Sequence, residues 1–263
     1  MSGWLAADIP SWLLLVGLLL LVVGGAALIQ TYVRRRHPGL SKGEHNDAIK
    51  FTYGFIGYVY AFFIGFVVSS MWGQINSADG NARAEGAAAV QMAQYLNVFE
   101  KADSDRIRQS LLTYERAAIA EWTHAADSRS PEADSALSGL YASYRQITPE
   151  SDVQKTSLAT SFSNLDKISQ ARTERLSTAR QDTGPPWPLW TVIFLTSAMV
   201  VGTAILYGVQ NRAEHYPMVA IVSAIVAANL FLLLELSYPY IGGVSTTSDP
   251  LEEVVRMLSQ PVP

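Results

Sequence analysis

The residues that could carry acid/base or metal chemistry are few and scattered along the chain. The histidines at positions 37, 45, 124 and 215 include no pair at the spacing of a helical metal-ligand motif. Asp79, Glu85 and Glu121 could act as general acids or bases, but carboxylates on helices are expected to lie on solvated faces. The chain has no cysteine, which excludes thiol nucleophiles, thiolate ligands and disulfides. The sequence therefore predicts neither an enzyme nor a metal or cofactor site.

Two polar side chains lie in or beside strongly apolar segments, where a polar group indicates either packing or function. Asn229 lies inside an apolar run, and Thr196 and Thr203 of the preceding run could bond to it or to backbone carbonyls. We interpret Asn229 first as a link between helices. Glu235 follows the same run, where water or a lipid headgroup could solvate it as an interfacial charge. Neither residue makes a proton relay by itself, and both are kept as candidate site residues.

The segment after residue 50 carries two side-chain patterns on a helical period. Small residues recur every four positions, at Gly57, Ala61, Gly65, Ser69, Gly73 and Ser77. An aromatic line runs beside this ridge, at Phe51, Phe55, Tyr58, Phe62 and Phe66. In one interpretation the ridge packs inside a single protomer, because small residues let helix backbones approach closely in lipid. In the other, the helix surrounds the symmetry axis of an oligomer and one of the two patterns lines a pore, where hydrophobic constrictions gate by dewetting.

The element that carries these patterns is one of four apolar runs, each long enough to cross a bilayer. Apolar residues make up 49% of the 263 residues and charged residues only 16%, which indicates that lipid is part of the solvent. The runs extend over Ile9 to Gln30, Phe51 to Asn76, Trp187 to Gln210 and Tyr216 to Leu234. About 20 apolar residues span the roughly 30 Å of hydrocarbon, so we expect four transmembrane helices. The net charge of -4 gives no case for a nucleic-acid partner.

The predicted fold class is an all-α integral membrane protein with a helical extramembrane domain inserted between the second and third spans. The expected divisions are a tail and first span at 1–33, a basic loop at 34–50, the second span at 51–76, the helical domain at 77–186, the third span at 187–210, a loop at 211–215, the fourth span at 216–236 and a tail at 237–263.

The Lys and Arg content of the short loops predicts the orientation. The loop between the first two spans contains residues Arg34 to Arg36, Lys42 and Lys50, and the loop between the last two contains Arg212. The N-terminal tail has no Lys or Arg, and the tail after the fourth span has only Arg256. We therefore expect both short loops in the cytoplasm of a multi-pass inner-membrane protein. Both termini and the large domain are then extracytoplasmic.

The inserted domain reads as helix throughout. The second span continues without proline through Ala82 to Phe99. Further helices are predicted to start at Ser104 and at two Ser/Thr-Pro-Glu triplets, beginning at Ser130 and Thr148. The first of these helices carries an apolar stripe at Ile107, Leu111, Tyr114, Ala118 and Trp122.

The order of several loose motifs resembles a bacterial bestrophin-like membrane-protein family of unknown function, over roughly residues 10 to 260. The carriers are residues 34–36, the segment Gly57 to Trp72, Glu85-Gly86-Ala87, Tyr114, Glu121-Trp122, Arg175 and Glu235 to Gly242. The last motif departs from the family pattern, which has an Asp-Arg pair where this chain has Ser237 and Tyr238. An ion pair at that place is therefore not carried over.

The resemblance implies a helical homo-oligomer, plausibly a pentamer, and suggests anion conduction, because bestrophins are pentameric chloride channels whose second span lines a hydrophobic neck. No acidic cluster resembling the bestrophin calcium clasp is evident in the sequence. Bestrophins hold their helical part in the cytoplasm, whereas the basic loops here favour the opposite side. The alternative function is a non-conducting interaction protein, anchored by the four spans, whose external domain binds a membrane or envelope complex.

Overall fold

The computed structural model describes residues 9–37, 46–122, 129–181, 183–207 and 212–260, and every regular element among them is a helix. Four of the helices are long and apolar enough to cross a membrane, which confirms the predicted fold class. The chain divides into two compact units, one formed by Met1–Gln74 and Thr183–Ser245 and the other by Ile75–Asp182 and Thr246–Pro263.

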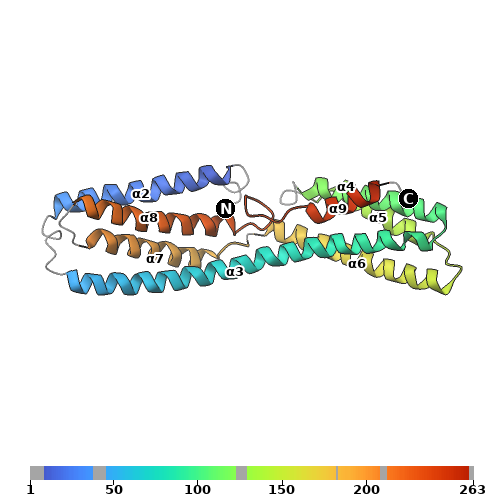
Figure 1. Ribbon diagram of the computed structural model, residues 1–263, viewed down its shortest axis with the longest axis horizontal. Coiled ribbons are helices and arrows are strands. Elements are labelled where there is room, and N and C mark those ends of the chain that lie inside the picture. The colour runs from blue at the N-terminus through green and yellow to red at the C-terminus, as the bar shows by residue number, and fades with distance from the viewer. Residues whose placement is uncertain (1–8, 38–45, 123–128, 182, 208–211, 261–263) are drawn as a thin grey trace. The chain divides into compact units, whose positions relative to one another are not determined.

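The first unit is a bundle of apolar helices (Figure 1). It contains α2 (Ser11–Arg36), α7 (Trp187–Leu206), α8 (Arg212–Glu235) and the first part of α3 (Asn46–Tyr95). α8 packs against both α2 and α7. A buried cluster at this packing contains Ala26, Ala204, Ile205 and Val219. The two alanines let the helix backbones approach closely, which favours association in lipid.

Polar side chains tie three of these helices together near the basic end of α2. The Arg34 guanidinium donates to Nδ1 of His215, with the shorter of two contacts at 2.7 Å. Because guanidinium only donates, Nδ1 is the accepting nitrogen and the proton lies on Nε2, which donates to the Ala204 carbonyl at 3.1 Å. The hydroxyls of Thr31 and Tyr216 are 3.0 Å apart. These bonds fix α2, α7 and α8 to one another.

α3 is continuous over 50 residues. At 1.5 Å per residue its length is about 75 Å, far more than the hydrocarbon core requires. This confirms that the second span continues as helix beyond residue 76. The α-helix ends at Tyr95, earlier than Phe99, because the last turn tightens into the 3-10 helix η2 (Leu96–Val98).

The second unit is a bundle around a fully buried apolar core. It contains the rest of α3 together with α4 (Lys101–Trp122), α5 (Pro131–Arg145), α6 (Asp152–Arg180) and α9 (Asp249–Ser259). The predicted stripe on α4 is confirmed, since all five of its members are buried. Its partners at or below 1% exposure include Met92, Leu96, Leu140, Tyr144, Leu165 and Ile168.

Of the predicted helix starts in this unit, the one at Ser130 is confirmed, and those at Thr148 and Ser104 differ from the structure. Ser130 caps α5 as predicted, because its hydroxyl accepts from the Ala133 amide. Thr148 does not cap α6, which begins at Asp152. The cap is Ser151, three residues after Thr148, and its hydroxyl accepts from the Gln154 amide. Ser104 lies inside α4, which already begins at Lys101, because its amide donates to the Glu100 carbonyl.

Two further boundaries differ from the expected ones. α7 ends at Leu206, and the residues that follow Tyr207 up to the expected end at 210 lie outside the described part of the chain. α8 begins at Arg212, before the expected start at 216, so that Pro217 lies inside its early turns. The stretch expected only as a tail contains α9, which packs on α4. Its start, Ser248-Asp249-Pro250, has a proline in the first turn, as α5 does.

Candidate functional site

The second unit contains a network of charged side chains that are cut off from solvent. Glu85 of α3, Glu121 of α4, and Arg172 and Arg175 of α6 are each 0–2% exposed. The expectation that Glu85 and Glu121 lie on solvated faces is therefore wrong. Asp79 does lie on such a face, paired with Arg83. Buried charges persist only when they are paired and hydrogen-bonded, so the partners of these four groups determine what the network does.

Arg172 uses its whole guanidinium group. Nε and Nη2 donate to the two oxygens of Glu121 at 2.9 and 2.7 Å, and Nη1 donates to Asp134 of α5 at 2.7 Å. The Ser130 amide also donates to Glu121, at 2.8 Å. Although burial opposes ionisation, these hydrogen bonds hold the pKa of Glu121 below its usual range. Arg172 therefore joins α4, α5 and α6, because it forms a bidentate ion pair with Glu121 and one further bond to Asp134.

Arg175 occupies the centre of the network. Its guanidinium lies 3.6 Å from carboxylate oxygens of both Glu85 and Glu121, and its Cζ lies 4.5 Å from the centre of the Trp122 ring. The Tyr114 hydroxyl donates to Glu85 at 2.7 Å. Burial, together with the charges of nearby carboxylates, raises the pKa of Tyr114 well above its usual value, so this hydroxyl remains a donor. The arrangement is a clamp across α3, α4 and α6.

Glu115 lies beside this clamp but takes no part in it. The residue is 0% exposed, and neither carboxyl oxygen has a hydrogen-bond partner within the described chain. Burial raises its pKa well above the usual range, the charge of Glu85 raises it further, and Arg175 opposes both. Among the buried carboxyl groups of the described chain, Glu115 is the one in which neither oxygen has a hydrogen-bond partner. This lack of a partner favours the protonated form of Glu115.

The predicted pore and packing residues lie on the outer surface of α3. Its buried row, Tyr60, Ile64, Val67 and Met71, is 3–5% exposed, and Tyr60 receives a hydrogen bond from Ser197 of α7. At about 100° per residue, the aromatic line lies on the opposite side of the helix. Phe55, Phe62 and Phe66 are 61%, 72% and 70% exposed.

The small-residue ridge does not pack against another helix of this protomer. A Cβ added at Gly57, Gly65 or Gly73 would meet nothing within 4 Å, and Ala61 and Ser69 are exposed. The interpretation that places the ridge inside one protomer is therefore wrong for the described chain. Ser69 follows Phe62 by seven residues and Gly73 follows Phe66 by seven, which is about two helical turns. The aromatic face therefore continues into small residues.

The two polar candidates of the fourth span have different surroundings. Asn229 is half-buried, and its side-chain amide makes no hydrogen bond within the described part of the chain. Thr196 and Thr203 bond to carbonyls of their own helix. Glu235 is 1% exposed, so water or headgroups do not solvate it as expected. It accepts from the Gly243 amide at 2.9 Å.

Gly243 belongs to a turn that only glycines can make. Gly242 has a φ of 98°, which other residues rarely adopt. A Cβ on Gly243 would lie 2.6 Å from the Ser11 hydroxyl, to which the Gly243 amide also donates. The motif from Glu235 to Gly242 therefore closes the end of the first unit around a buried carboxylate.

Comparison with known proteins decides the family. The profile of the family described as Bestrophin-like domain matches residues 20–251, which is most of the chain. The chain belongs to the bestrophin-like family. Among curated proteins, none matches it.

The fold of this bestrophin-like protein is that of a bacterial bestrophin homologue from Klebsiella pneumoniae. A crystal structure of one point variant superposes with a TM-score of 0.67 at 14% identity, covering 94% of this chain and 99% of the other. A second variant gives a TM-score of 0.68 at 15% identity, with coverages of 92% and 97%. A structure phased with zinc gives 0.64 at 17%, with coverages of 92% and 96%. At such identities the likeness establishes the fold.

Several of the residues that carried the resemblance, those in the second unit, meet in the buried clamp of this bestrophin-like protein. Glu85, Tyr114, Trp122 and Arg175 come from three helices and contact one another directly. Sequence reasoning missed Arg172 and Glu115. A signal was present, because Arg172 follows Ile168 by four residues on the buried stripe of α6, where an arginine needs a buried partner.

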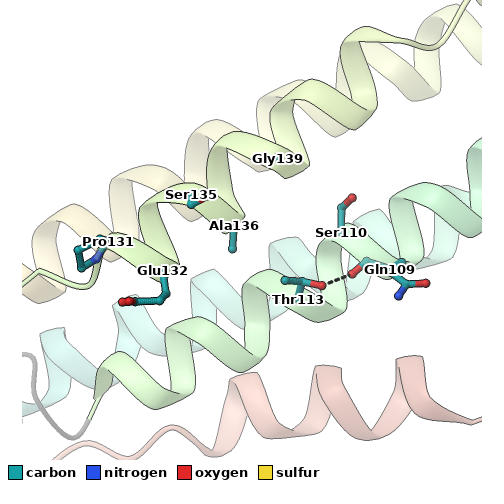
Figure 2. A pocket seen from close by; sticks show the side chains of 8 residues that line it. All are labelled: Gln109, Ser110, Thr113, Pro131, Glu132, Ser135, Ala136 and Gly139. Carbon is teal, nitrogen blue, oxygen red and sulfur yellow. Dashed lines mark hydrogen bonds between the residues drawn. The ribbon is translucent and has the colours of Figure 1, made fainter.

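The bestrophin-like protein also has an open groove between α4 and α5, with a volume of about 650 Å³ (Figure 2). Its walls include Ser110 and Thr113 of α4 and Ser135, Ala136 and Gly139 of α5. Of the described residues that line it, Glu132 is the one ionisable side chain. This lining lacks the convergent polar groups that fix a small ligand. The aromatic face of α3 is the stronger candidate for function.

Proposed function

We propose that this bestrophin-like protein assembles into a ring of five identical subunits and conducts anions through a pore lined by α3. The observation that carries the proposal is the exposed face of α3, where large aromatic side chains lie directly opposite the row that packs against the rest of the protomer. A helix bound to its own bundle on one side presents its other side to lipid or to neighbouring subunits. The small residues continuous with that face favour neighbouring helices.

The composition of α3 favours anions over cations. From Phe51 to Ala78 the sequence has no charged residue, so the span lacks the carboxylate ring that lines many cation-selective pores. The edges of aromatic rings carry partial positive charge. A collar formed by Phe62 and Phe66 from each subunit would exclude water when narrow and present ring edges to an ion when open.

Halide flux from liposomes that contain the purified protein tests the proposal. We expect flux above that of empty liposomes, and a several-fold increase in flux for Phe62→Ala, because the shorter side chain widens and wets the collar. Phe194→Ala is the matched control, since Phe194 of α7 is also exposed, at 54%, but lies outside α3. Its flux should equal that of the unmodified protein.

Two results would count against conduction. Flux equal to that of empty liposomes at every potential and pH tested would remove the channel function. A stoichiometric complex with a different membrane protein, in place of a closed ring of this chain, would favour the anchored interaction protein instead.

We also propose that the helical domain lies outside the cytoplasm. The basic residues Arg34 to Arg36 end α2, and the domain follows one span later. Because the chain is free of cysteine, an impermeant thiol reagent on intact cells can test this. We expect labelling of Ser138→Cys, at an exposed position of α5, and no labelling of His37→Cys, at the exposed end of α2, until the cells are lysed. The reverse pattern would place the domain in the cytoplasm.

A further inference from the structure

The C-terminal helix α9 covers one face of α4 within the second unit (Figure 1). Its apolar side, Leu251, Val254 and Leu258, is 0–4% exposed. At one end, Arg108 of α4 donates to the carbonyls of Leu258 and Gln260, both at 3.4 Å. At the other end, the Trp122 indole donates to the carbonyl of Thr246, three residues before α9 begins, at 3.2 Å.

The unpartnered carboxyl group of Glu115 lies on the face that α9 covers. Glu115 is seven residues after Arg108 and seven before Trp122, and seven residues are about two turns of helix. All three residues therefore lie on the same side of α4, with Glu115 midway between the two attachments of α9. The fit is close, because a Cβ on Gly86 of α3 would lie 2.8 Å from the Pro250 carbonyl oxygen.

Among the described residues, no charged group forms a hydrogen bond with the Glu115 carboxyl group. From α3 it faces the carboxylate of Glu85, and from α6 it faces Arg175, which is held between Glu85 and Glu121. The neighbouring Tyr114 hydroxyl donates to Glu85. The charged side chains of α9 all lie on its exposed side, at Asp249, Glu252, Glu253 and Arg256. An ionised Glu115 under α9 is therefore a buried charge without a partner.

We propose that α9 is a pH-controlled cover, which docks on α4 when Glu115 is protonated and leaves when Glu115 is ionised. Release lets water reach the carboxylate and removes the cost of its burial. Docking raises the pKa of Glu115 above its exposed value of about 4.3. Docking is therefore strongest below that value and weakens as the pH rises toward the raised pKa, by up to about tenfold in the docking equilibrium per pH unit. This inference is independent of whether the protein conducts ions.

Thiol labelling of the full chain in detergent measures the release of α9. In the variant Leu258→Cys, the thiol lies on the buried side of α9 and reacts only when this helix leaves α4. The same substitution combined with Glu115→Gln has the same intrinsic thiol chemistry but cannot ionise at position 115. We expect the ratio of the two labelling rates, ionisable over Gln, to rise with pH between pH 5 and 9, by up to about tenfold per unit, until it levels off at the pKa of Glu115.

A second cysteine separates release of α9 from unfolding of the whole unit. Leu140→Cys, in the fully buried core of α5, should stay protected over the same pH range. Should Glu115→Gln fail to fold, Glu115→Met serves as the variant that cannot ionise. A rate ratio that does not change with pH would overturn the proposal. Labelling of Cys at position 140 in parallel with position 258 would also overturn it, because the whole unit would then be opening.

Discussion

Replacing Arg172 by Met is expected to lower the free energy of unfolding by about 3–5 kcal/mol. The substitution leaves Glu121, which is 2% exposed, with a buried charge and without its bidentate partner. Denaturant unfolding of the full chain in detergent micelles, followed by helical circular dichroism, measures the change. The large effect comes from stranding one charge, since a buried ion pair as a whole stabilises little relative to an apolar pair.

Two further variants isolate that cause. Arg83→Met removes an exposed arginine from its pair with Asp79, and should change the stability by less than about 1 kcal/mol. The double variant Arg172→Met with Glu121→Met should recover most of the loss, because Arg175 keeps its contact with Glu85 and Asp134 keeps its pair with Arg129. If the double variant is as unstable as Arg172→Met alone, the clamp acts through packing and the electrostatic explanation fails.

Gly65→Trp is expected to weaken assembly. A single protomer has room for the indole ring, since nothing lies within 4 Å of a Cβ at Gly65. A neighbouring subunit packed on the ridge would not, so the association constant should fall at least about tenfold, which corresponds to about 1.4 kcal/mol. Light scattering of the purified protein in detergent measures the size of the assembly, and liposome flux should fall with it.

Gly17→Trp provides the comparison for this change. Gly17 of α2 is also an exposed glycine in an apolar helix with nothing within 4 Å of its Cβ. Its replacement should leave both assembly and flux unchanged. An intact assembly for Gly65→Trp would show that the ridge faces lipid, and the placement of α3 at the axis would have to be abandoned.

The sequence predicted the features that depend on regular spacing. The four spans follow from the lengths of apolar runs, and the stripe on α4 from residues three and four apart. The start of α5 followed from Ser130, whose cap bond depends on neighbours in the chain. Each of these rests on local pattern, which a single chain displays directly.

The features that the sequence did not predict depend on contacts between distant segments. Glu85 and Glu121 have the composition of a solvated face, and only the arrival of Arg172 and Arg175 from α6 makes their burial tolerable. The burial of Glu235 required Gly243 from beyond the helix end. The exposure of Gly65 could not be decided from spacing, because a ridge of small residues suits a protomer core and a subunit interface equally.

The packing of α9 on α4 also sets an order for biosynthesis. Proteins emerge from the ribosome N-terminus first, and α9 follows every other described helix in the chain. The face of α4 with Glu115 and the gap beside Gly86 therefore stay uncovered until the third and fourth spans have been made. The extramembrane bundle is completed by the segment synthesised after the last span. A chain that ends before α9 leaves the ribosome with the carboxylate of Glu115 hydrated and ionised, whereas the finished protein buries this group.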